Sequence, residues 1–582
     1  MSQSSVPMHG GERVAAALAA HGVRCLFTLC GGHISPILVA AKRRGIRIVD
    51  TRDEATAVFA ADAVARLTGT PGVAAVTAGP GLTNTITALK NAQLAQSPVV
   101  LLGGAAPTAL QGRGALQDID QHRLIAPHVK RVTRVRNVAA LGPAVEQALV
   151  IARDGVPGPA FVECPVDLLY DETLIRGWYR DAAGRGTSIA DRLLRWYLNR
   201  HANRMFAGSA RPYRPAAATV ATPEAGTGAV ARAAEALRRA RQPLMVLGSQ
   251  AVVAAGEAPR VAEAVARLGV PVYLSGMARG VLGRDTGLQM RHARRAALRE
   301  ADVVLLAGVP CDFRLDYGKH VRRSATLIAA NRSRKDARLN RRPSIEAVGD
   351  AGRFIVALAQ GLGDGARRGE WIGHLHERDA EREREIEAQA RAAGEHVNPV
   401  AFFRALDRTA AEHAVFVADG GDFVATASYL LRPRGPLAWL DPGAFGTLGV
   451  GAGFALGASV VTPAAEVWLL WGDGACGYGL AELDTFVRHG IPVIAVVGND
   501  AGWTQIAREQ VKLLGDDVGT TLARTAYHEV AKGFGAEGLE IRRDADVEAG
   551  LAQARRIAAT GKPVLVNVWL DKTGFREGSI SM

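Results

Sequence analysis

Short apolar runs alternate with helical stretches in three separate parts of this chain of 582 residues. In the first part, apolar runs predict strands at 46–49, 73–76, 99–102 and 160–162, with a helical pattern at 54–67. The second part repeats the pattern with strands near 244, 272, 303 and 327, and the third with strands at 415–418, 467–471, 493–497 and 564–569. Strands that alternate with helices are typical of a parallel, doubly wound sheet. We therefore predict an α/β fold with three such domains.

Two segments interrupt this alternation. Residues 171–225 lose it, with an isolated amphipathic helix predicted at 192–206 and an Ala-, Pro-, Gly- and Thr-rich linker at 207–228. Residues 367–393 are highly charged and helical in pattern, and predict a second connector. The expected domains are therefore 8–180, 229–362 and 397–582, separated by a linker with a helix at 181–228 and a charged helical connector at 363–396.

Composition places the chain among ordinary soluble globular proteins. Its hydrophobic content is 48% and its charged content 22%, and its length suggests several domains rather than one core. No apolar run reaches the roughly 20 residues that span a bilayer, and the start lacks the apolar core of a signal peptide. Five cysteines are scattered without a CxxC pair, which argues against a zinc site or a disulfide framework. We expect a cytoplasmic protein without a membrane partner.

The formal net charge of +13 raises the question of an anionic partner. Basic residues mostly alternate with acidic ones, as at 381–385, which is typical of a solvated helix face. Only residues 331–342 are locally dense in basic side chains, directly after a predicted strand. Two interpretations stay open there: a structural or solubility role, or contact with the phosphates of CoA or another nucleotide in a crevice. A nucleic-acid partner is not expected.

Two acidic residues follow neighbouring predicted strands in the third part. Asp473 stands in a Gly-Asp-Gly turn after the strand at 467–471, and Asp500 follows the strand at 493–497. The carboxyl ends of parallel strands meet at one edge of the sheet, where ligands bind, so the two carboxylates are placed to converge on one Mg²⁺. Alone, a Gly-Asp-Gly turn also fits a plain connection from strand to helix.

The spacing of these residues resembles the signature of thiamine diphosphate (ThDP) enzymes, which begins GDG and ends in NN or ND. The resemblance implies that Asp473 and Asp500 bind Mg²⁺ through side chains and Gly502 through its carbonyl oxygen. The diphosphate would lie against the backbone of Gly472, Gly474, Ala475 and Cys476, at the start of the next helix. Many family members carry Asn where this chain has Asp500, which adds a negative charge here.

Three further motifs carry the same resemblance. The segment 50–66 is similar to the family's strand, acidic turn and Ala-rich helix, which implies that Glu54 binds the cofactor pyrimidine and promotes its active tautomer; alone, it is also a favourable acidic residue in a first helical turn. The segment 77–84 resembles the TSGPGxTN turn, and 446–448 the family's GTM segment. By position, the cofactor contacts would be Pro80, Asn84, Gly421, Gly446 and Leu448. No phosphate contact is assigned to Asp422.

Substrate contacts follow from the closest resemblance, which is to acetolactate synthase-like proteins described as 2-hydroxyacyl-CoA lyases. It is carried by the segments 31–36, 425–427, 439–449 and 497–505. Such enzymes cleave a 2-hydroxyacyl-CoA to formyl-CoA and an aldehyde, and can run the condensation in reverse. His33 and Gln117 would then contact the reacting atoms, and Trp503, Thr504 and Gln505 would line the substrate mouth. A Cys at position 30 departs from the proline of acetolactate synthases. The C-terminal tail, 575–582, would either close over the thioester or fray.

Two other functions stay open. One is an acetolactate synthase that condenses 2-oxo acids such as pyruvate and commonly carries FAD. The other is a non-catalytic protein of this fold that binds a nucleotide or a partner, against which Glu54, Asp473 and Asp500 argue. Whether the central domain binds CoA, ADP, FAD or nothing is left open. The resemblance also implies a homodimer or homotetramer.

Overall fold

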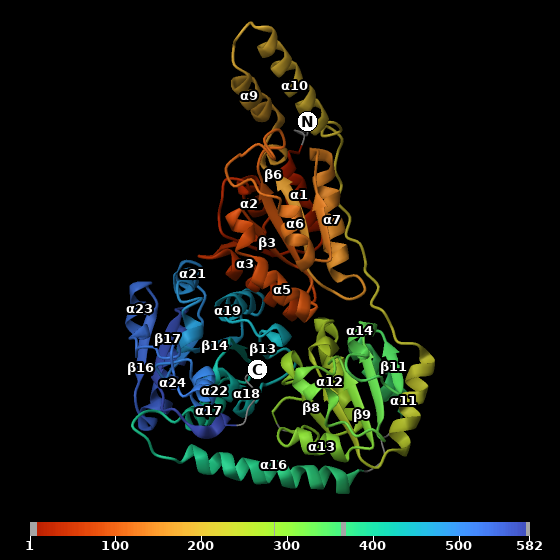
Figure 1. Cartoon of the computed structure of the whole chain (residues 1–582), viewed down its shortest axis with the longest axis vertical. Helices are drawn as coiled ribbons and strands as arrows, with labels where there is room; N and C mark the ends of the chain where they lie inside the picture. Colours follow the sequence, from red (N-terminus) through yellow and green to blue (C-terminus); the bar gives the residue numbers. More distant parts are fainter. Residues whose placement is uncertain (1–7, 285, 363–367, 578–582) are drawn as a thin grey trace. The chain divides into compact units, whose positions relative to one another are not determined.

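The computed structural model describes residues 8–284, 286–362 and 368–577 of the chain (Figure 1). It forms two compact units: unit 1 comprises Met1–Arg66 and Thr70–Ala221, and unit 2 comprises Leu67–Gly69 and Thr222–Met582. Unit 1 contains one sheet and unit 2 contains two, and every strand pair in the three sheets is parallel. The predicted fold class of three doubly wound parallel sheets is confirmed.

The sheet of unit 1 has six strands in the order β2-β1-β3-β4-β6-β5. The strands are β1 (Cys25–Thr28), β2 (Arg47–Asp50), β3 (Gly72–Val76), β4 (Val99–Ala105), β5 (Arg131–Arg134) and β6 (Ala160–Pro165). The helices around it are α1 (Gly10–Ala20), α2 (Ser35–Arg43), α3 (Glu54–Thr68), α4 (Pro80–Thr83), α5 (Ile86–Ala95), α6 (Gln121–Ile125), α7 (Val138–Arg153) and α8 (Val166–Leu169). The apolar pattern predicted four of these strands. It missed β1, a buried strand of four residues, and β5, an edge strand whose side chains are partly exposed.

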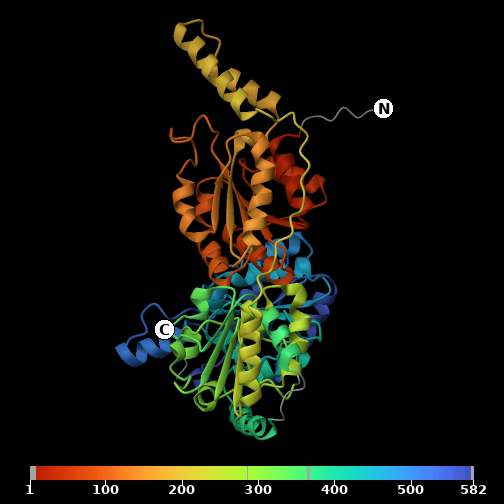
Figure 2. The ribbon, with the colours of Figure 1, turned by 90° about the vertical axis from the view of Figure 1, so that its right-hand side faces the viewer.

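A helical hairpin follows this sheet in unit 1. Its helices are α9 (Glu172–Ala183) and α10 (Ile189–Met205), and Figure 2 shows them extending away from the sheet of that unit. The helix predicted at 192–206 begins three residues earlier in the structure. Ser188 caps it, because its side chain accepts from the Asp191 amide while the Asp191 carboxylate accepts from the Ser188 amide.

The first sheet of unit 2 has the strand order β11-β10-β9-β7-β8. Its strands are β7 (Pro243–Leu247), β8 (Val272–Leu274), β9 (Val303–Ala307), β10 (Thr326–Asn331) and β11 (Ile345–Val348). The helices are α11 (Thr227–Arg239), α12 (Ala258–Leu268), α13 (Arg294–Glu300), α14 (Arg334–Ala337) and α15 (Ala351–Leu362). The charged connector forms α16 (Gly369–Ala390), which stays attached to the fold by burying three apolar side chains: Trp371, Leu375 and Ile386.

The second sheet of unit 2 has the order β13-β12-β14-β15-β17-β16. Its strands are β12 (Ala414–Ala418), β13 (Trp439–Leu440), β14 (Glu466–Gly472), β15 (Ile494–Asn499), β16 (Glu537–Ile541) and β17 (Val564–Trp569). The helices are α17 (Pro399–Thr409), α18 (Asp422–Leu430), α19 (Val450–Val461), α20 (Asp473–Cys476), α21 (Glu482–Arg488), α22 (Thr504–Leu514), α23 (Tyr527–Gly533) and α24 (Val547–Ala559). Its central strands are continuously apolar because helices cover both faces.

The boundaries predicted for the individual domains stay predictions. In the part of the chain that the structure describes, no helix combines the length and the apolar composition that crossing a bilayer requires.

Candidate active site

Glu54 begins α3 directly after β2, and its side chain is buried. Its Oε2 accepts a hydrogen bond of 2.9 Å from Nδ2 of Asn84. Its Oε1 faces Gly81, where an added Cβ would lie 3.4 Å away. The predicted carboxylate and the predicted turn at 77–84 are therefore in direct contact, although they are 30 residues apart in sequence.

The turn itself depends on Gly79. Its φ of 61° lies in the left-handed region, and an added Cβ would lie 2.7 Å from the carbonyl oxygen of Gln117. The Gly79 amide donates to Oε1 of Gln121, which sequence reasoning did not identify. Pro80 then starts α4. The backbone of Gln117, also at a positive φ of 63°, thus packs against the turn that holds Pro80 and Asn84.

His33 lies at the same edge of this sheet. Its Nδ1 is 3.0 Å from Oγ1 of Thr77, which follows β3, and burial lowers the pKa of His33. An added Cβ on Gly104 of β4 would lie 2.5 Å from the Cβ of His33. The carboxyl edge of the unit 1 sheet therefore brings together Glu54, Asn84 and His33, with Gln117 beside them.

Asp473 follows β14 in unit 2 and is 4% exposed. Its Oδ1 accepts from the Gly474 amide at 2.9 Å, and its Oδ2 accepts from the Gly502 amide at 3.0 Å. Burial raises the pKa of Asp473 to about 7, with a further contribution from Asp500. Burial also raises the pKa of Asp500. A buried carboxyl group whose ionisation is opposed by burial and by a neighbouring carboxyl group is a setting in which a divalent cation would be stabilising.

The donor set also fits a hard cation. Among the described residues, no group of three or more His, Cys, Asp and Glu side chains is placed to hold a metal. A two-carboxylate site completed by a backbone carbonyl, as predicted for Gly502, is compatible with this finding. Ala501, between Asp500 and Gly502, has a φ of 58°. This left-handed conformation precedes Gly502, whose amide donates to Asp473.

Gly474 allows Trp503 to pack on the start of α20. An added Cβ on Gly474 would lie 2.6 Å from two atoms of the Trp503 ring. Ala475 and Cys476 are buried in the same turn, and the Cys476 thiol donates to the Asp473 carbonyl at 3.1 Å. Burial raises the pKa of Cys476 to about 12, which keeps it a neutral thiol. Trp503 caps α22, and Thr504 and Gln505 are its first two residues.

Asp419, which sequence reasoning missed, organises the loop that carries Gly446 and Leu448. It lies after β12 and is 2% exposed. Its Oδ1 accepts from the Gly449 amide at 2.9 Å and its Oδ2 from the Gly451 amide at 2.7 Å. Its position after an apolar strand was the available signal.

Close packing fixes the same loop. An added Cβ on Gly420 would lie 2.2 Å from Cδ2 of Leu448, so the leucine covers the Gly420–Gly421 turn. Gly421 and Gly446 have φ values of 101° and 65°. Asp422 pairs with Arg508 through hydrogen bonds of 3.0 and 2.7 Å, which gives this carboxylate a structural partner.

A cavity of about 660 Å³ opens at the carboxyl ends of β8 and β9 in unit 2. Seven arginines line it: Arg279, Arg291, Arg294, Arg295, Arg314, Arg382 and Arg576. Two acidic residues, Asp316 and Glu577, also line it. Burial lowers the pKa of Arg279 and Arg294, and that of Arg291 to about 10. Arg314 and Arg382 pair with Asp312 and Glu385. Arginines still outnumber the acidic side chains around the cavity, and this excess of positive charge favours an anionic ligand.

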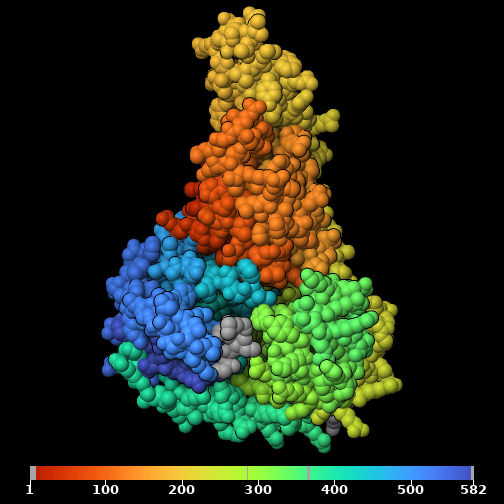
Figure 3. Space-filling model, viewed as in Figure 1, coloured from red at the N-terminus to blue at the C-terminus, as the bar shows by residue number. Residues whose placement is uncertain are grey.

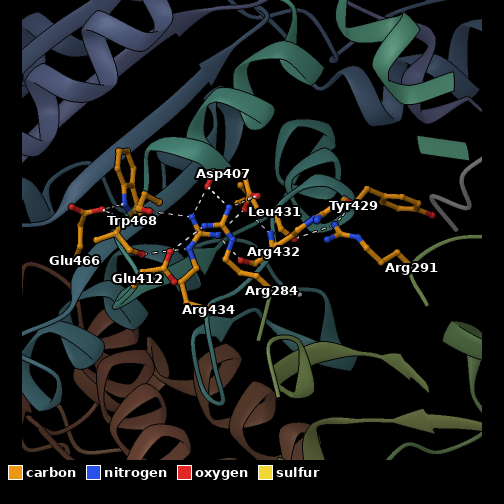
Figure 4. Close-up of polar contacts among 12 residues, drawn as sticks. Arg284, Arg291, Asp407, Glu412, Tyr429, Leu431, Arg432, Arg434, Glu466 and Trp468 are labelled. Atoms are coloured by element: carbon orange, nitrogen blue, oxygen red, sulfur yellow. Dashed lines mark hydrogen bonds and ion pairs between the residues drawn. The ribbon is translucent and has the colours of Figure 1, made fainter. Parts of the chain in front are cut away.

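Backbone carbonyls hold part of this wall. Arg291 donates to the carbonyls of Tyr429 and Leu431 at 2.6 and 3.2 Å, and Figure 4 shows it reaching the segment that also carries Arg432 and Arg434. Arg279 donates to the Ser428 carbonyl at 2.7 Å. Neutral carbonyls orient these guanidinium groups without cancelling their charge.

The end of the described chain reaches this cavity. Phe575 and Arg576 line it, with the Arg576 guanidinium 4.7 Å from the ring centre of Tyr429. The rest of the predicted closing tail, residues 578–582, lies outside the described residues.

The basic run at 331–342 has partners within its own domain. Arg332 pairs with Asp350 at 2.7 Å, and Arg338 with Glu346 at 2.6 Å. Arg341 donates to the carbonyls of Gly318 and Val321. These contacts favour the structural interpretation, since the run does not line the arginine cavity.

Comparison with known proteins covers most of the chain. Residues 8–124 match the family model described as "Thiamine pyrophosphate enzyme, N-terminal TPP binding domain", 230–358 match the central domain, and 419–568 match the C-terminal TPP binding domain. Thiamine pyrophosphate is the same compound as ThDP, which is the cofactor of this family. The matched segments contain Glu54, Asp473 and Asp500.

Full-length relatives agree with these matches. A 2-hydroxyacyl-CoA lyase 2 from Bos taurus is 52% identical over 99% of this chain and 92% of its own, and that from Homo sapiens is 51% identical over the same shares. A probable acetolactate synthase from Mycobacterium bovis is 36% identical over 98% of both chains. The chain therefore belongs to the thiamine pyrophosphate enzyme family.

Proposed function

We propose that this protein is a ThDP- and Mg²⁺-dependent lyase that cleaves a 2-hydroxyacyl-CoA to formyl-CoA and an aldehyde, and that can run the condensation in reverse. Its 2-hydroxyacyl-CoA lyase 2 relatives, at about half identity over nearly the whole chain, support this proposal. The observation that carries it is the arginine-lined cavity, because CoA brings a diphosphate and a further phosphate that a 2-oxo acid lacks.

Each unit has its own set of residues that we propose to contact the cofactor. Glu54 would accept a hydrogen bond from the pyrimidine, with Asn84 holding its other oxygen. Asp473, Asp500 and the Gly502 carbonyl would bind Mg²⁺, and the amides at the start of α20 would face the diphosphate. Bound ThDP supplies a nucleophilic carbon and an electron sink for the cleavage.

The reaction requires the bond between the thioester carbonyl carbon and the hydroxyl-bearing carbon to break. The hydroxyl proton leaves as the aldehyde forms, and the acyl carbon gains a proton to become the formyl group. We propose that His33 and Gln117 contact the thioester oxygen and the hydroxyl group. Burial lowers the pKa of His33, which favours the neutral ring, the form that can accept a proton.

Trp503, Thr504 and Gln505 are proposed to line the approach to the reacting centre. All three lie at the start of α22, directly after the proposed metal ligands. The arginine cavity is proposed to bind the CoA phosphates, with Arg295 as an exposed contributor on its wall. The homodimer or homotetramer and the cytoplasmic location are also kept as proposals.

Product identification tests the reaction. The purified protein, supplied with ThDP and Mg²⁺, is offered formyl-CoA with an aldehyde and, separately, pyruvate, and the products are identified by mass. A 2-hydroxyacyl-CoA in the first reaction is expected. Acetolactate from pyruvate with no 2-hydroxyacyl-CoA would instead establish the synthase, and no ThDP-dependent product in either reaction would favour the non-catalytic alternative.

The cavity has its own test in the variant Arg295→Gln. A rise in KM for the CoA substrate of about tenfold is expected, since a charge-assisted contact to phosphate contributes about 1.5–3 kcal/mol. Arg267→Gln, an exposed arginine of α12 that does not line the cavity, is the matched control. Equal KM values for the two variants would contradict the assignment of this cavity to CoA.

A further inference from the structure

The helical hairpin of unit 1 exposes a continuous apolar face. Ile189, Leu193 and Trp196 are 77%, 61% and 61% exposed, and they follow one another at spacings of four and three residues along α10. Leu194 and Tyr197 extend this face at 43% and 41% exposure. Large apolar side chains grouped on one helix face mark a surface that contacts a partner.

The hairpin is firmly attached at its base. Asp167, which is 1% exposed, accepts hydrogen bonds from the Thr108 hydroxyl at 2.6 Å and from the Tyr179 hydroxyl of α9 at 2.6 Å. Oγ1 of Thr108 is also 2.6 Å from Nε2 of His201 in α10. These contacts hold both helices to the body of unit 1, while the start of α10 projects away from it (Figures 2 and 3). The apolar face is therefore presented by a fixed element.

The hairpin is also strongly basic. Residues 172–205 contain seven arginines and three acidic residues. Arg185, Arg192 and Arg200 are exposed, and the Arg200 guanidinium lies 5.6 Å from the ring centre of Trp196. An arginine beside an exposed tryptophan is the arrangement that suits a lipid interface, where the ring enters the headgroup layer and the guanidinium meets phosphate.

We propose that the α9–α10 hairpin is a docking surface for the face of an anionic phospholipid bilayer. An apolar face flanked by arginines is typical of helices that lie in the membrane interface. A second copy of this hairpin is a poorer occupant, because it would bring equal positive charge to the same surface. Since the attachment is peripheral, it needs neither a spanning helix nor a long apolar run, the features on which the prediction of no membrane partner was based.

Vesicle binding tests the proposal independently of any enzymatic activity. The full-length protein is mixed with vesicles of phosphatidylcholine containing phosphatidylglycerol, and with vesicles of phosphatidylcholine alone, and the bound fraction is measured by flotation. Binding is expected on the anionic vesicles and is expected to weaken as salt is raised. Equal binding to both kinds of vesicle, or none to either, would overturn the proposal.

Variants locate the contact. The triple variant Ile189→Ser, Leu193→Ser and Trp196→Ser is expected to lower partitioning onto anionic vesicles by tenfold or more. The reason is that it removes the apolar side chains that would be buried in the membrane interface. The matched control is Val39→Ser, which removes an apolar side chain that is 50% exposed on α2 of the same unit. If the control and the triple variant bind anionic vesicles equally, the proposal is contradicted.

Two further measurements keep the result interpretable. The far-ultraviolet circular dichroism of the triple variant is compared with that of the original protein; if helix is lost, the double variant Arg192→Gln and Arg200→Gln takes its place and is expected to lower partitioning by about tenfold. Light scattering gives the molecular mass of each. The bilayer assignment is refuted if the original protein does not bind vesicles and the triple variant has a smaller molecular mass than the original protein. That result would show that the apolar face joins copies of this chain.

Discussion

Replacing Gly474 by alanine tests how the start of α20 and Trp503 fit together. The new Cβ would lie 2.6 Å from two atoms of the Trp503 ring and 2.8 Å from a third, distances that ordinary packing does not allow. The backbone of Gly474 does not require a positive φ, so the effect comes from the contact and not from the conformation of residue 474. Overpacking of this kind costs about 1–3 kcal/mol in the free energy of unfolding.

Urea denaturation followed by circular dichroism measures this cost. Gly477→Ala is the matched control, because its added Cβ would meet its nearest neighbour at 3.4 Å in an ordinary van der Waals contact. We expect the control to be neutral or up to about 1 kcal/mol more stable, since alanine restricts the unfolded chain. Gly474→Ala should have a lower urea midpoint and reduced turnover, because the ring it displaces begins the proposed substrate wall.

A double-mutant cycle isolates the contact. In a Trp503→Ala background, Gly474→Ala should cost less than about 0.5 kcal/mol, since the ring that it would strike is gone. A cost for Gly474→Ala that is the same with and without the ring would refute the packing account. Equal midpoints for Gly474→Ala and Gly477→Ala would do the same.

Three other predictions follow from the site. Glu54→Ala should abolish ThDP-dependent turnover while the far-ultraviolet circular dichroism stays unchanged. Asn84→Ala, which removes only the hydrogen-bond donor to Glu54, should retain measurable turnover. Near-normal turnover in Glu54→Ala would remove Glu54 from its proposed role. Burial raises the pKa of Asp419 from an ordinary 3.8 to about 7, so the folded state binds this proton more tightly, and the contribution of Asp419 to stability should fall as pH rises from about 4 to about 7. Asp419→Asn lacks that titration, so the change in urea midpoint between pH 5 and pH 8 should be smaller than in the original protein, and an unchanged difference would contradict this reasoning. Removing Mg²⁺ with a chelator should abolish the rise in Tm that ThDP produces. Asp473→Ala should show no rise in Tm with ThDP even when Mg²⁺ is present. Asp500→Asn, which carries the amide more usual in the family, should keep the rise in Tm.

Local patterns were sufficient to predict most of the strands and three long helices, α3, α10 and α16. The strands at the centre of each sheet are continuous apolar runs because both of their faces are covered, so each is legible without knowledge of its neighbours. The edge strands β5 and β16 were missed for the converse reason, since their partly exposed side chains mix polar and apolar residues. Helix α9 was also missed, because a buried face supplied by only two side chains leaves little apolar pattern.

Site residues divide in the same way. Asp473 and Glu54 stand in motifs whose spacing is local, and both were predicted. Asp419 was not, because its function depends on the amides of Gly449 and Gly451, which are 30 and 32 residues away. The arginine cavity was also beyond sequence reasoning. The dense basic run at 331–342 pairs with its own domain, whereas the cavity gathers arginines from positions 279 to 576.

The sequence by itself therefore determined the class of fold and the family, and it predicted the candidate residues whose chemistry depends on short spacing. Backbone preferences and apolar periodicity act over a few residues, so a linear pattern records them. Only the tertiary structure decided which distant charges share a cavity, which carboxylates are buried, and which apolar side chains stay in water. Those properties arise from solvent exclusion and from contacts between segments far apart in the chain. The sequence shows that Ile189, Leu193 and Trp196 are apolar, but only the folded structure shows that they stay exposed to solvent.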